Sequence, residues 1–257
     1  MGWVLDLDGV VWLADRPIEG SADAIRRLRE AGHQVVFATN NSSQPVARVE
    51  AKLADHGIEA AGAVVTSAMA AAAVIAPGST AFVCAGPGVV EALSDRGVEV
   101  VTHGDADVVV VGLHRCFDYG RMDAAARAVR RGARLLGTND DATYPTPDGL
   151  RPGAGAILAA VATVAAAVPE VAGKPHEPMA ALIRERLGGD SGVDDAVVGR
   201  RPETDGVVVG DRVNTDGELA RRLGYRFGLV MTGVTETPVD GVDLVGPDLA
   251  ALVEDEL

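Results

Sequence analysis

Cysteine and long apolar runs are both scarce in this chain. Its two cysteines, Cys84 and Cys116, form no CxxC motif and no Cys/His cluster, so neither a disulfide framework nor a zinc site is indicated. We interpret both as small, buried apolar residues. No run of roughly 18 uncharged apolar residues occurs, and the N-terminus has no basic segment followed by an apolar one. The sequence therefore predicts a cytoplasmic protein without a membrane-spanning segment.

Lysine is nearly absent as well. The chain has 23 Asp, 14 Glu and 21 Arg but only two Lys, Lys52 and Lys174, and its formal charge is −14. This charge argues against nucleic acid or an anionic membrane as a partner, because phosphate backbones attract patches of Lys and Arg. An acidic, Lys-poor surface is typical of a salt-rich cytoplasm, but a GC-rich genome that favours Arg codons explains it equally well. Full stability without salt, measured from low to molar KCl, would exclude the first explanation.

Aromatic residues make up only 4% of the chain, whereas hydrophobic residues make up 47% and Ala, Val and Gly dominate. This composition suits helices packed on a buried sheet. Short apolar runs alternate with helical patterns, which is typical of an α/β fold with a doubly wound, Rossmann-like parallel sheet. We expect residues 1–77 and 172–257 to form a core domain, and residues 78–171 to form a smaller, inserted α/β domain. The expected strands are 3–7, 33–38, 81–85, 98–101, 108–113, 134–137, 207–209 and 227–231, and the expected helices are 22–31, 45–56, 89–96, 122–131, 154–168, 178–187 and 215–223.

Acidic residues follow two of the predicted strands. Asp6 and Asp8 stand at the carboxyl end of the first strand, where open α/β sheets bind ligands. Their side chains point the same way on an extended chain, and two unpaired carboxylates about 4 Å apart repel by roughly 4 kcal/mol, so they require a cation. Asp211 and Asp216 follow the run 206–209, and a parallel sheet would bring them beside the first pair. All four are candidate ligands of Mg²⁺, although each motif alone also fits an acidic turn or a helix cap.

Two polar features are expected at the same edge of the sheet. Thr39, Asn40 and Asn41 follow the strand 33–38, and a hydroxyl with the N–H groups of such a turn can hold phosphate oxygens. An ordinary loop with a helix cap is the alternative. Lys174 is one of only two lysines in a chain that otherwise uses Arg, which indicates a position that needs a compact ammonium rather than a planar guanidinium. We therefore expect Lys174 to neutralise Asp6 and a phosphate oxygen. A solvated loop lysine is the alternative here.

In this order and spacing, the four features resemble the motifs of the haloacid dehalogenase-like phosphatases. The insertion resembles the C2-type cap of their 4-nitrophenylphosphatase group (NagD-type, subfamily IIA). The resemblance implies an enzyme, a phosphoric monoester hydrolase that uses Mg²⁺ to remove phosphate from a small organic ester. It implies that Asp6 attacks phosphorus to form an aspartyl phosphate, and that Asp8 protonates the leaving alkoxide and later activates water. Further segments that carry the resemblance are Thr138-Asn139-Asp140, Tyr144-Pro145-Thr146, Pro152-Gly153-Ala154-Gly155 and Leu229-Val230-Met231-Thr232-Gly233-Val234-Thr235.

The resemblance also assigns the binding residues. Thr39 and the Asn40 amide would bind phosphate, and Lys174 would hold both the nucleophile and the phosphate. Residues 10–20 are too few for a lid, so the inserted domain is expected to cover the site, exclude water and choose the substrate. Its candidate contacts are Asp140, Tyr144 and the turn of Pro152 to Gly155. The implied metal ligands are Asp6, the carbonyl of Asp8, Asp211 and, through water, Asp216.

Three features depart from the family pattern. His114 stands where Asp is more usual, which leaves the chemistry of the inserted domain open. Gly217 replaces an aliphatic residue after Asp216, which is expected to weaken helix packing rather than the metal site. Residues 189–205 form a longer connection than the pattern needs, and the sequence gives them no role.

Other functions compete with a phosphatase. A phosphotransferase or mutase could use the same aspartyl phosphate. A receiver-type signalling module has similar groups but is about half this length, and its phosphorylated Asp does not lie on the first strand. A catalytically silent phosphate-binding protein would not need both Asp6 and Asp8. Phosphoglycolate, glycerol phosphate, pyridoxal phosphate, nucleoside monophosphates and sugar phosphates all stay open as substrates, and the sequence is compatible with a homodimer formed through the inserted domain.

Overall fold

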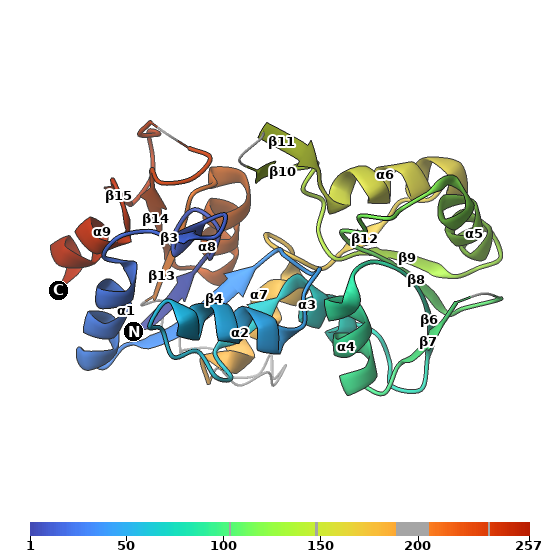
Figure 1. Ribbon diagram of the computed structural model, residues 1–257, viewed down its shortest axis with the longest axis horizontal. Helices are drawn as coiled ribbons and strands as arrows, with labels where there is room; N and C mark the ends of the chain where they lie inside the picture. Colours follow the sequence, from blue (N-terminus) through green and yellow to red (C-terminus); the bar gives the residue numbers. More distant parts are fainter. Residues whose placement is uncertain (103, 147–148, 189–205, 236) are drawn as a thin grey trace, which may run out of the picture. The chain divides into compact units, whose positions relative to one another are not determined.

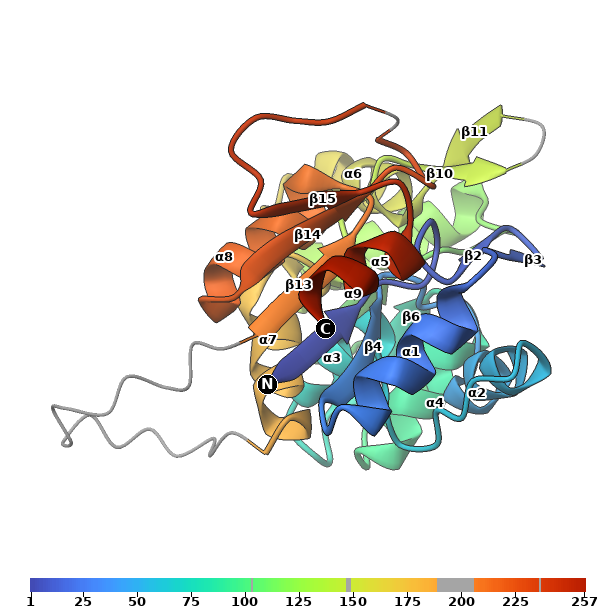
Figure 2. The same cartoon turned by 90° about the vertical axis from the view of Figure 1, so that its left-hand side faces the viewer.

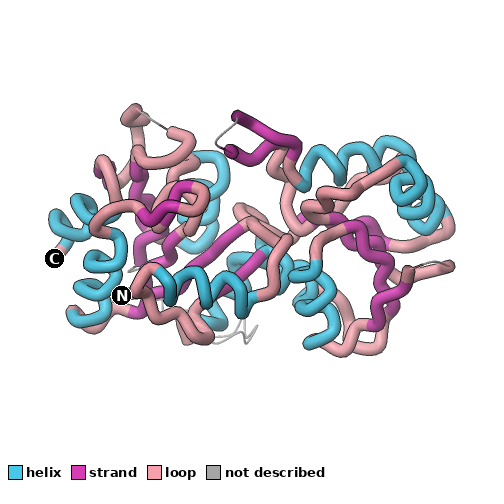
Figure 3. Tube along the Cα trace, viewed as in Figure 1, coloured by secondary structure: helices cyan, strands magenta, loops and turns pink. Residues whose placement is uncertain are grey.

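The computed structural model describes residues 1–257 apart from 103, 147–148, 189–205 and 236 (Figure 1). The chain forms two compact units. The first comprises Met1–Thr39, Glu50–Val65 and Ala180–Leu257, and the second comprises Asn40–Val49 and Thr66–Met179. Each unit is built on a sheet of parallel strands with helices packed against it, which confirms the predicted α/β fold (Figure 3). The expected domain boundaries, with an insertion at residues 78–171, stay a prediction.

The sheet of the first unit has six strands in the order β15-β14-β13-β1-β4-β5. The central strand β1 pairs in parallel with β13 on one side and β4 on the other, so Leu5 lies opposite both Val209 and Phe37. The strand order reverses direction at β1, and ligands of open α/β sheets bind at the carboxyl ends of the strands beside such a reversal. The strands are β1 (Gly2–Leu5), β4 (Gln34–Thr39), β5 (Val64–Thr66), β13 (Gly206–Gly210), β14 (Arg226–Val230) and β15 (Leu244–Gly246).

Burial of the central strands explains their sequence. Strand β13 reads Gly-Val-Val-Val-Gly and is buried throughout, as expected for a parallel strand covered on both faces. Helices α1 and α9 pack against each other over one face of the sheet, and α8 lies on the opposite face (Figures 1 and 2). The helices of this unit are α1 (Ser21–Glu30), α2 (Val46–Asp55), α7 (Glu177–Arg186), α8 (Glu218–Leu223) and α9 (Leu249–Glu256). The first residues of α2 and of α7 belong to the second unit.

The second unit has a five-stranded sheet in the order β12-β9-β8-β6-β7 and a separate antiparallel hairpin, β10-β11. Helices α5 and α6 pack against each other and onto β8, where Phe82, Val109 and Leu158 are part of the core. The strands are β6 (Thr80–Cys84), β7 (Glu99–Val101), β8 (Val108–Val111), β9 (Arg134–Gly137), β10 (Thr143–Thr146), β11 (Gly149–Pro152) and β12 (Glu170–Val171). The helices are α3 (Ser67–Ala73), α4 (Pro87–Asp95), α5 (Tyr119–Arg130) and α6 (Ala154–Ala165).

Most expected elements are present, with ends that differ by a few residues. The helix expected at 215–223 instead begins with a π-helical turn, η1 (Val213–Gly217), before α8. The sequence did not predict β5, α3, β12, β15 or α9. It also did not predict the hairpin β10-β11 or a second antiparallel hairpin, which joins β2 (Trp12–Leu13) to β3 (Arg16–Pro17). Within the described part of the chain, no helix combines the length and apolar character needed to cross a membrane.

Candidate active site

Three carboxylates meet at the carboxyl edge of the first unit's sheet. Asp6 directly follows β1 and Asp211 directly follows β13, and the two strands are paired, since the Asp6 N–H donates to the Val209 carbonyl at 2.9 Å. The π-helical turn η1 supplies Asp216. One ligand oxygen of each of the three carboxylates lies within 4.8 Å of the other two. The structure therefore brings together three of the four residues that the acidic motifs suggested.

Two members of this cluster are buried and hydrogen-bonded by the backbone, and Asp6 is half-buried. Asp211 is 3% exposed and Asp216 is fully buried. The Val234 N–H donates to Asp211 Oδ2 at 2.6 Å, and the Arg212 N–H donates to Asp216 Oδ2 at 3.2 Å. Two carboxylates 4.8 Å apart repel by roughly 3.5 kcal/mol at an effective dielectric constant of 20. A donor set made only of carboxylate oxygens fits a hard divalent cation such as Mg²⁺.

Two glycines let the backbone approach Asp211 closely. A Cβ atom at Gly233 would lie 2.0 Å from Asp211 Oδ2, and a Cβ atom at Gly9 would lie 2.7 Å from the same oxygen. Gly9 also has a φ of 89°, which a residue with a side chain rarely adopts. The Thr232 hydroxyl donates to the Gly9 carbonyl and so ties the segment after β14 to the loop after β1. The segments around residues 9 and 233, which both carry the family resemblance, thus enclose Asp211, one of the implied metal ligands.

Asp8 lies outside the carboxylate cluster. Its side chain is exposed, and its Oδ1 accepts a hydrogen bond of 2.9 Å from the Trp12 indole N–H. The resemblance implies only the Asp8 carbonyl, not its carboxylate, as a metal ligand. Thr39 ends β4 and is 2% exposed. The other phosphate-binding candidates, Asn40, Asn41 and Lys174, belong to the second unit, and the expected proximity of Lys174 to Asp6 stays a prediction.

Within the second unit, the Asn40 side chain fixes the backbone of Lys174. The Lys174 N–H donates to Asn40 Oδ1 at 2.8 Å, and Asn40 Nδ2 donates to the Lys174 carbonyl at 3.1 Å and to Asp141 Oδ2 at 3.0 Å. The Asn40 carbonyl in turn accepts from Ser67 Oγ and Asn139 Nδ2, both at 2.7 Å. Lys174 is only 3% exposed, and a buried ammonium requires negative charge nearby. Sequence reasoning considered only the Asn40 amide and missed this function of the side chain.

The remaining candidates of the second unit lie around the hairpin β10-β11. Asp140 Oδ2 is 3.4 Å from His176 Nε2, and this hydrogen bond lowers the pKa of the Asp140 carboxyl. Tyr144 lies within β10, and Pro152 ends β11. A Cβ atom at Gly155 would lie 2.3 Å from the Asp140 carbonyl oxygen, so the turn of Pro152 to Gly155 packs directly under the Asp140 loop.

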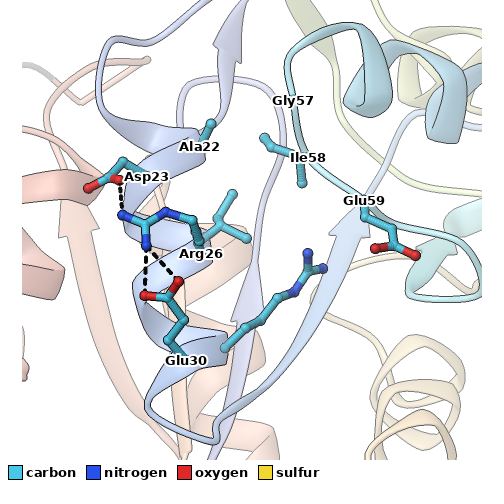
Figure 4. Close-up of a pocket in the computed structure, with 9 residues that line it drawn as sticks. Ala22, Asp23, Arg26, Glu30, Gly57, Ile58 and Glu59 are labelled. Atoms are coloured by element: carbon cyan, nitrogen blue, oxygen red, sulfur yellow. Dashed lines mark hydrogen bonds and ion pairs between the residues drawn. The ribbon is translucent and has the colours of Figure 1, made fainter.

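An open pocket of about 490 Å³ lies elsewhere in the first unit, between α1 and the loop that contains Ile58 (Figure 4). Arg26 on this helix is paired with Asp23 and with Glu30, as the dashed lines in Figure 4 show. None of the predicted site residues lines the pocket.

Comparison with known proteins identifies the family. A family model described as haloacid dehalogenase-like hydrolase matches residues 3–99, and a second HAD-hydrolase-like model matches residues 171–252. The acid sugar phosphatase of Staphylococcus saprophyticus is 35% identical over 207 residues, which cover 79% of this chain and 80% of that protein. The chain belongs to the haloacid dehalogenase-like hydrolases. Its motifs had predicted this membership, which is confirmed.

Two solved structures of the family place the chain among its phosphatases. The p-nitrophenyl phosphatase from Archaeoglobus fulgidus is 30% identical, with a TM-score of 0.88 over 99% of this chain and 98% of that one. The glycerol phosphate phosphatase from Mycobacterium tuberculosis, solved in complex with magnesium, is also 30% identical, with a TM-score of 0.83 over 98% of this chain and 77% of that one. The predicted 4-nitrophenylphosphatase (NagD-type) group and the predicted phosphatase class are confirmed.

The structure shows the surroundings of Gly217 and His114, two of the residues that depart from the haloacid dehalogenase-like pattern. The ring of Phe227 packs on Gly217, because a Cβ atom there would lie 3.2 Å from Phe227 Cδ1. The ring thus occupies the room that an aliphatic side chain would use. Burial lowers the pKa of His114, and among the described residues its buried Nδ1 has no hydrogen-bond partner. The third departure, residues 189–205, lies outside the described residues.

Proposed function

We propose that this phosphatase hydrolyses a small organic phosphate monoester with Mg²⁺, through an aspartyl phosphate formed on Asp6. The observation that carries the proposal is the cluster of half-buried Asp6 with buried Asp211 and Asp216 at the carboxyl end of β1. Relatives whose names describe phosphatases, one of them solved with magnesium, support it. Phosphate monoesters are among the slowest compounds to hydrolyse unaided, so the activation free energy of hydrolysis is large. Charge neutralisation and a covalent intermediate are two ways to lower it.

In the first proposed step, an Asp6 carboxylate oxygen bonds to phosphorus while the ester P–O bond breaks. Asp8 gives its proton to the departing oxygen, so the alcohol leaves neutral. In the second step, Asp8 takes a proton from a water molecule whose oxygen attacks phosphorus, and the bond to Asp6 breaks. Inorganic phosphate is released, Asp6 returns to its carboxylate form, and Asp8 again carries the proton with which it began. When bound, Mg²⁺ would neutralise the negative charge that the phosphate and the acidic cluster bring together.

Phosphate binding is assigned to uncharged donors and one ammonium. We assign the Thr39 hydroxyl and the amides of Asn40 and Asn41 to the phosphate oxygens, and the Lys174 ammonium to the charge shared by phosphate and Asp6. The two hydrogen bonds between the Asn40 side chain and the Lys174 backbone support this role, because they restrict where the ammonium can reach. A guanidinium, with its fixed planar fork, would not replace this compact charge.

The proposed substrate class is a small phosphate ester of an alcohol or sugar. Relatives named for acid sugar, p-nitrophenyl and glycerol phosphate substrates support this class without choosing within it. We expect p-nitrophenyl phosphate to be accepted as a surrogate. A panel of sugar, polyol, nucleoside and carboxylic acid phosphates, assayed for released phosphate with Mg²⁺, would rank the natural candidates.

The test of the reaction is Asp6→Asn, with Asp255→Asn as the matched control on the exposed face of α9. We expect Asp6→Asn to lose phosphate release from every ester of the panel while the control retains it. Phosphate release by Asp6→Asn at the wild-type rate would overturn the proposal. Transfer of the phosphoryl group to an added alcohol in preference to water would instead establish a phosphotransferase.

A further inference from the structure

The segment that follows Asp8 folds into a small hairpin around one tryptophan. The N–H groups of Val11 and Trp12 donate to the Leu7 carbonyl at 2.9 and 3.2 Å, and the Gly9 N–H donates to the Trp12 carbonyl at 2.7 Å. This turn places Trp12 beside Asp8 as a β-bridge partner. The Trp12 side chain is 4% exposed, and its indole N–H reaches Asp8 Oδ1 at 2.9 Å.

Lys52, one of only two lysines in the chain, holds this hairpin from α2. Its ammonium lies 4.2 Å from the centroid of the Trp12 ring, donates to the Ala14 carbonyl at 2.7 Å and lies 3.7 Å from the Asp15 carboxylate. Asp15 is fully exposed, so this ion pair adds little, whereas the ring and carbonyl contacts fix the lysine in place. Ala14 has a φ of 54°, an unusual conformation that the bond from Lys52 helps to hold. His56 follows on the same side, with its ring 6.0 Å from that of Trp12.

We propose that Trp12 is a positioning residue for the Asp8 carboxylate, and that Lys52 keeps Trp12 in place. The proposal rests on the proposed function, in which Asp8 moves the proton to the leaving oxygen and from water. An exposed aspartate samples several side-chain orientations, and proton transfer needs one within hydrogen-bond reach of the reacting oxygen. A rigid indole N–H at 2.9 Å selects that orientation before the substrate binds.

The geometry argues against a bond that serves only the tryptophan. A buried indole N–H usually finds a partner, but the partner here is an exposed carboxylate that water could equally satisfy. The chain's other tryptophan offers a comparison. The Trp3 indole nitrogen is buried and has no hydrogen-bond partner among the described residues, so a protein partner for a buried indole is not a general rule in this fold. The bond to Asp8 therefore constrains Asp8.

The variant Trp12→Phe tests the proposal because it keeps an aromatic ring for Lys52 and removes the N–H. Its kcat/KM should be measured with glycerol phosphate, whose alkoxide must be protonated to leave, and with p-nitrophenyl phosphate, whose phenolate leaves without that help. We expect a loss of roughly 10- to 100-fold with the alkyl ester. The loss with the aryl ester should be several-fold smaller, and KM should stay near the wild-type value for both. Trp3→Phe is the matched control and should leave the ratio of the two kcat/KM values unchanged.

Two further variants keep the test decisive. Lys52→Met removes the ammonium from the surface of the hairpin and should reproduce a weaker form of the same leaving-group-dependent loss. In an Asp8→Asn background, Trp12→Phe should cause no further loss, since the group that it positions is already gone. Equal losses for the two esters would show a merely structural role for Trp12 and overturn the proposal, as would unchanged kinetics. Asp6→Asn should be assayed alongside. An active Asp6→Asn would show that the proposed function is wrong, whereas an inactive Asp6→Asn together with equal losses for the two esters would show that only the proposal for Trp12 is wrong.

Discussion

Asp216→Asn provides a direct test of the metal site. Asp216 is fully buried, and one of its carboxylate oxygens lies within 4.8 Å of oxygens from Asp6 and Asp211. At that distance, each pair of carboxylates repels by roughly 3.5 kcal/mol at an effective dielectric constant of 20. A divalent cation relieves this repulsion, so Mg²⁺ should stabilise the folded protein. Asparagine keeps nearly the same shape and can still accept the Arg212 N–H, but it removes one of the three charges.

The size of the effect follows from binding linkage. At a Mg²⁺ concentration about 100-fold above its Kd, the wild-type protein gains about 2.7 kcal/mol, which corresponds to a rise in Tm of roughly 5 to 10 °C. Loss of a supporting carboxylate typically weakens metal affinity about 10- to 100-fold. At the same concentration, Asp216→Asn should therefore gain only about 0.4 to 1.4 kcal/mol.

The assay is thermal unfolding of chelator-treated protein titrated with MgCl₂, followed by circular dichroism. Asp255→Asn, which removes a charge from exposed surface on α9, is the control and should shift like the wild type. An equal Mg²⁺-dependent rise in Tm for Asp216→Asn and the wild type would refute the assignment of Asp216. No rise in the wild type would refute the cluster as a metal site.

Three further predictions concern other parts of the structure. Gly233→Ala should abolish the Mg²⁺-dependent rise in Tm, because its Cβ atom would meet a carboxylate oxygen of the cluster at 2.0 Å; an unchanged rise would contradict this. Asn40→Ala should lower kcat by about 10-fold or more while the fold is kept, because the Lys174 backbone loses both of its bonds to that side chain; unchanged steady-state kinetics would show that these bonds do not matter. Cys84 is buried as expected, but Cys116 is exposed, so the expectation that both cysteines are buried was wrong for Cys116. Burial raises the pKa of Cys84 to about 12, so iodoacetamide at pH 8 should alkylate only Cys116 in the native protein and both thiols after unfolding; peptide mass spectrometry reads the result, and native alkylation of Cys84 would be the contrary outcome.

The acidic cluster was predictable from the sequence because its geometry follows from the strands. Continuous apolar runs identify β1 and β13 as buried parallel strands, and the carboxyl ends of such strands meet at one edge. Asp6 and Asp211 stand at the carboxyl ends of these strands and so share that edge, and the pairing of β1 with β13 brings them close together. No side-chain detail was needed for this step.

The contacts that support the site were not predictable, because they join residues without a local pattern. Asn40 and Lys174 are 134 positions apart, and nothing in either segment indicates that a side-chain amide binds a distant backbone. Sequence reasoning made no prediction for Trp12, since a single tryptophan in a two-residue strand shows no periodicity. Strand β5 and helix α3, which form from an alanine-rich stretch, were not predicted for a related reason. Short apolar runs fit helix and strand equally well.

The central claim is that Asp6 becomes phosphorylated during turnover. Rapid acid quench of the wild-type enzyme with its ester and Mg²⁺, followed by peptide mass spectrometry, measures this directly. The account predicts one phosphoryl group on the N-terminal peptide at Asp6, formed and lost at rates that match turnover, and absent from Asp6→Asn. Steady phosphate release without a phosphorylated peptide, or with the phosphoryl group on another residue, would contradict it.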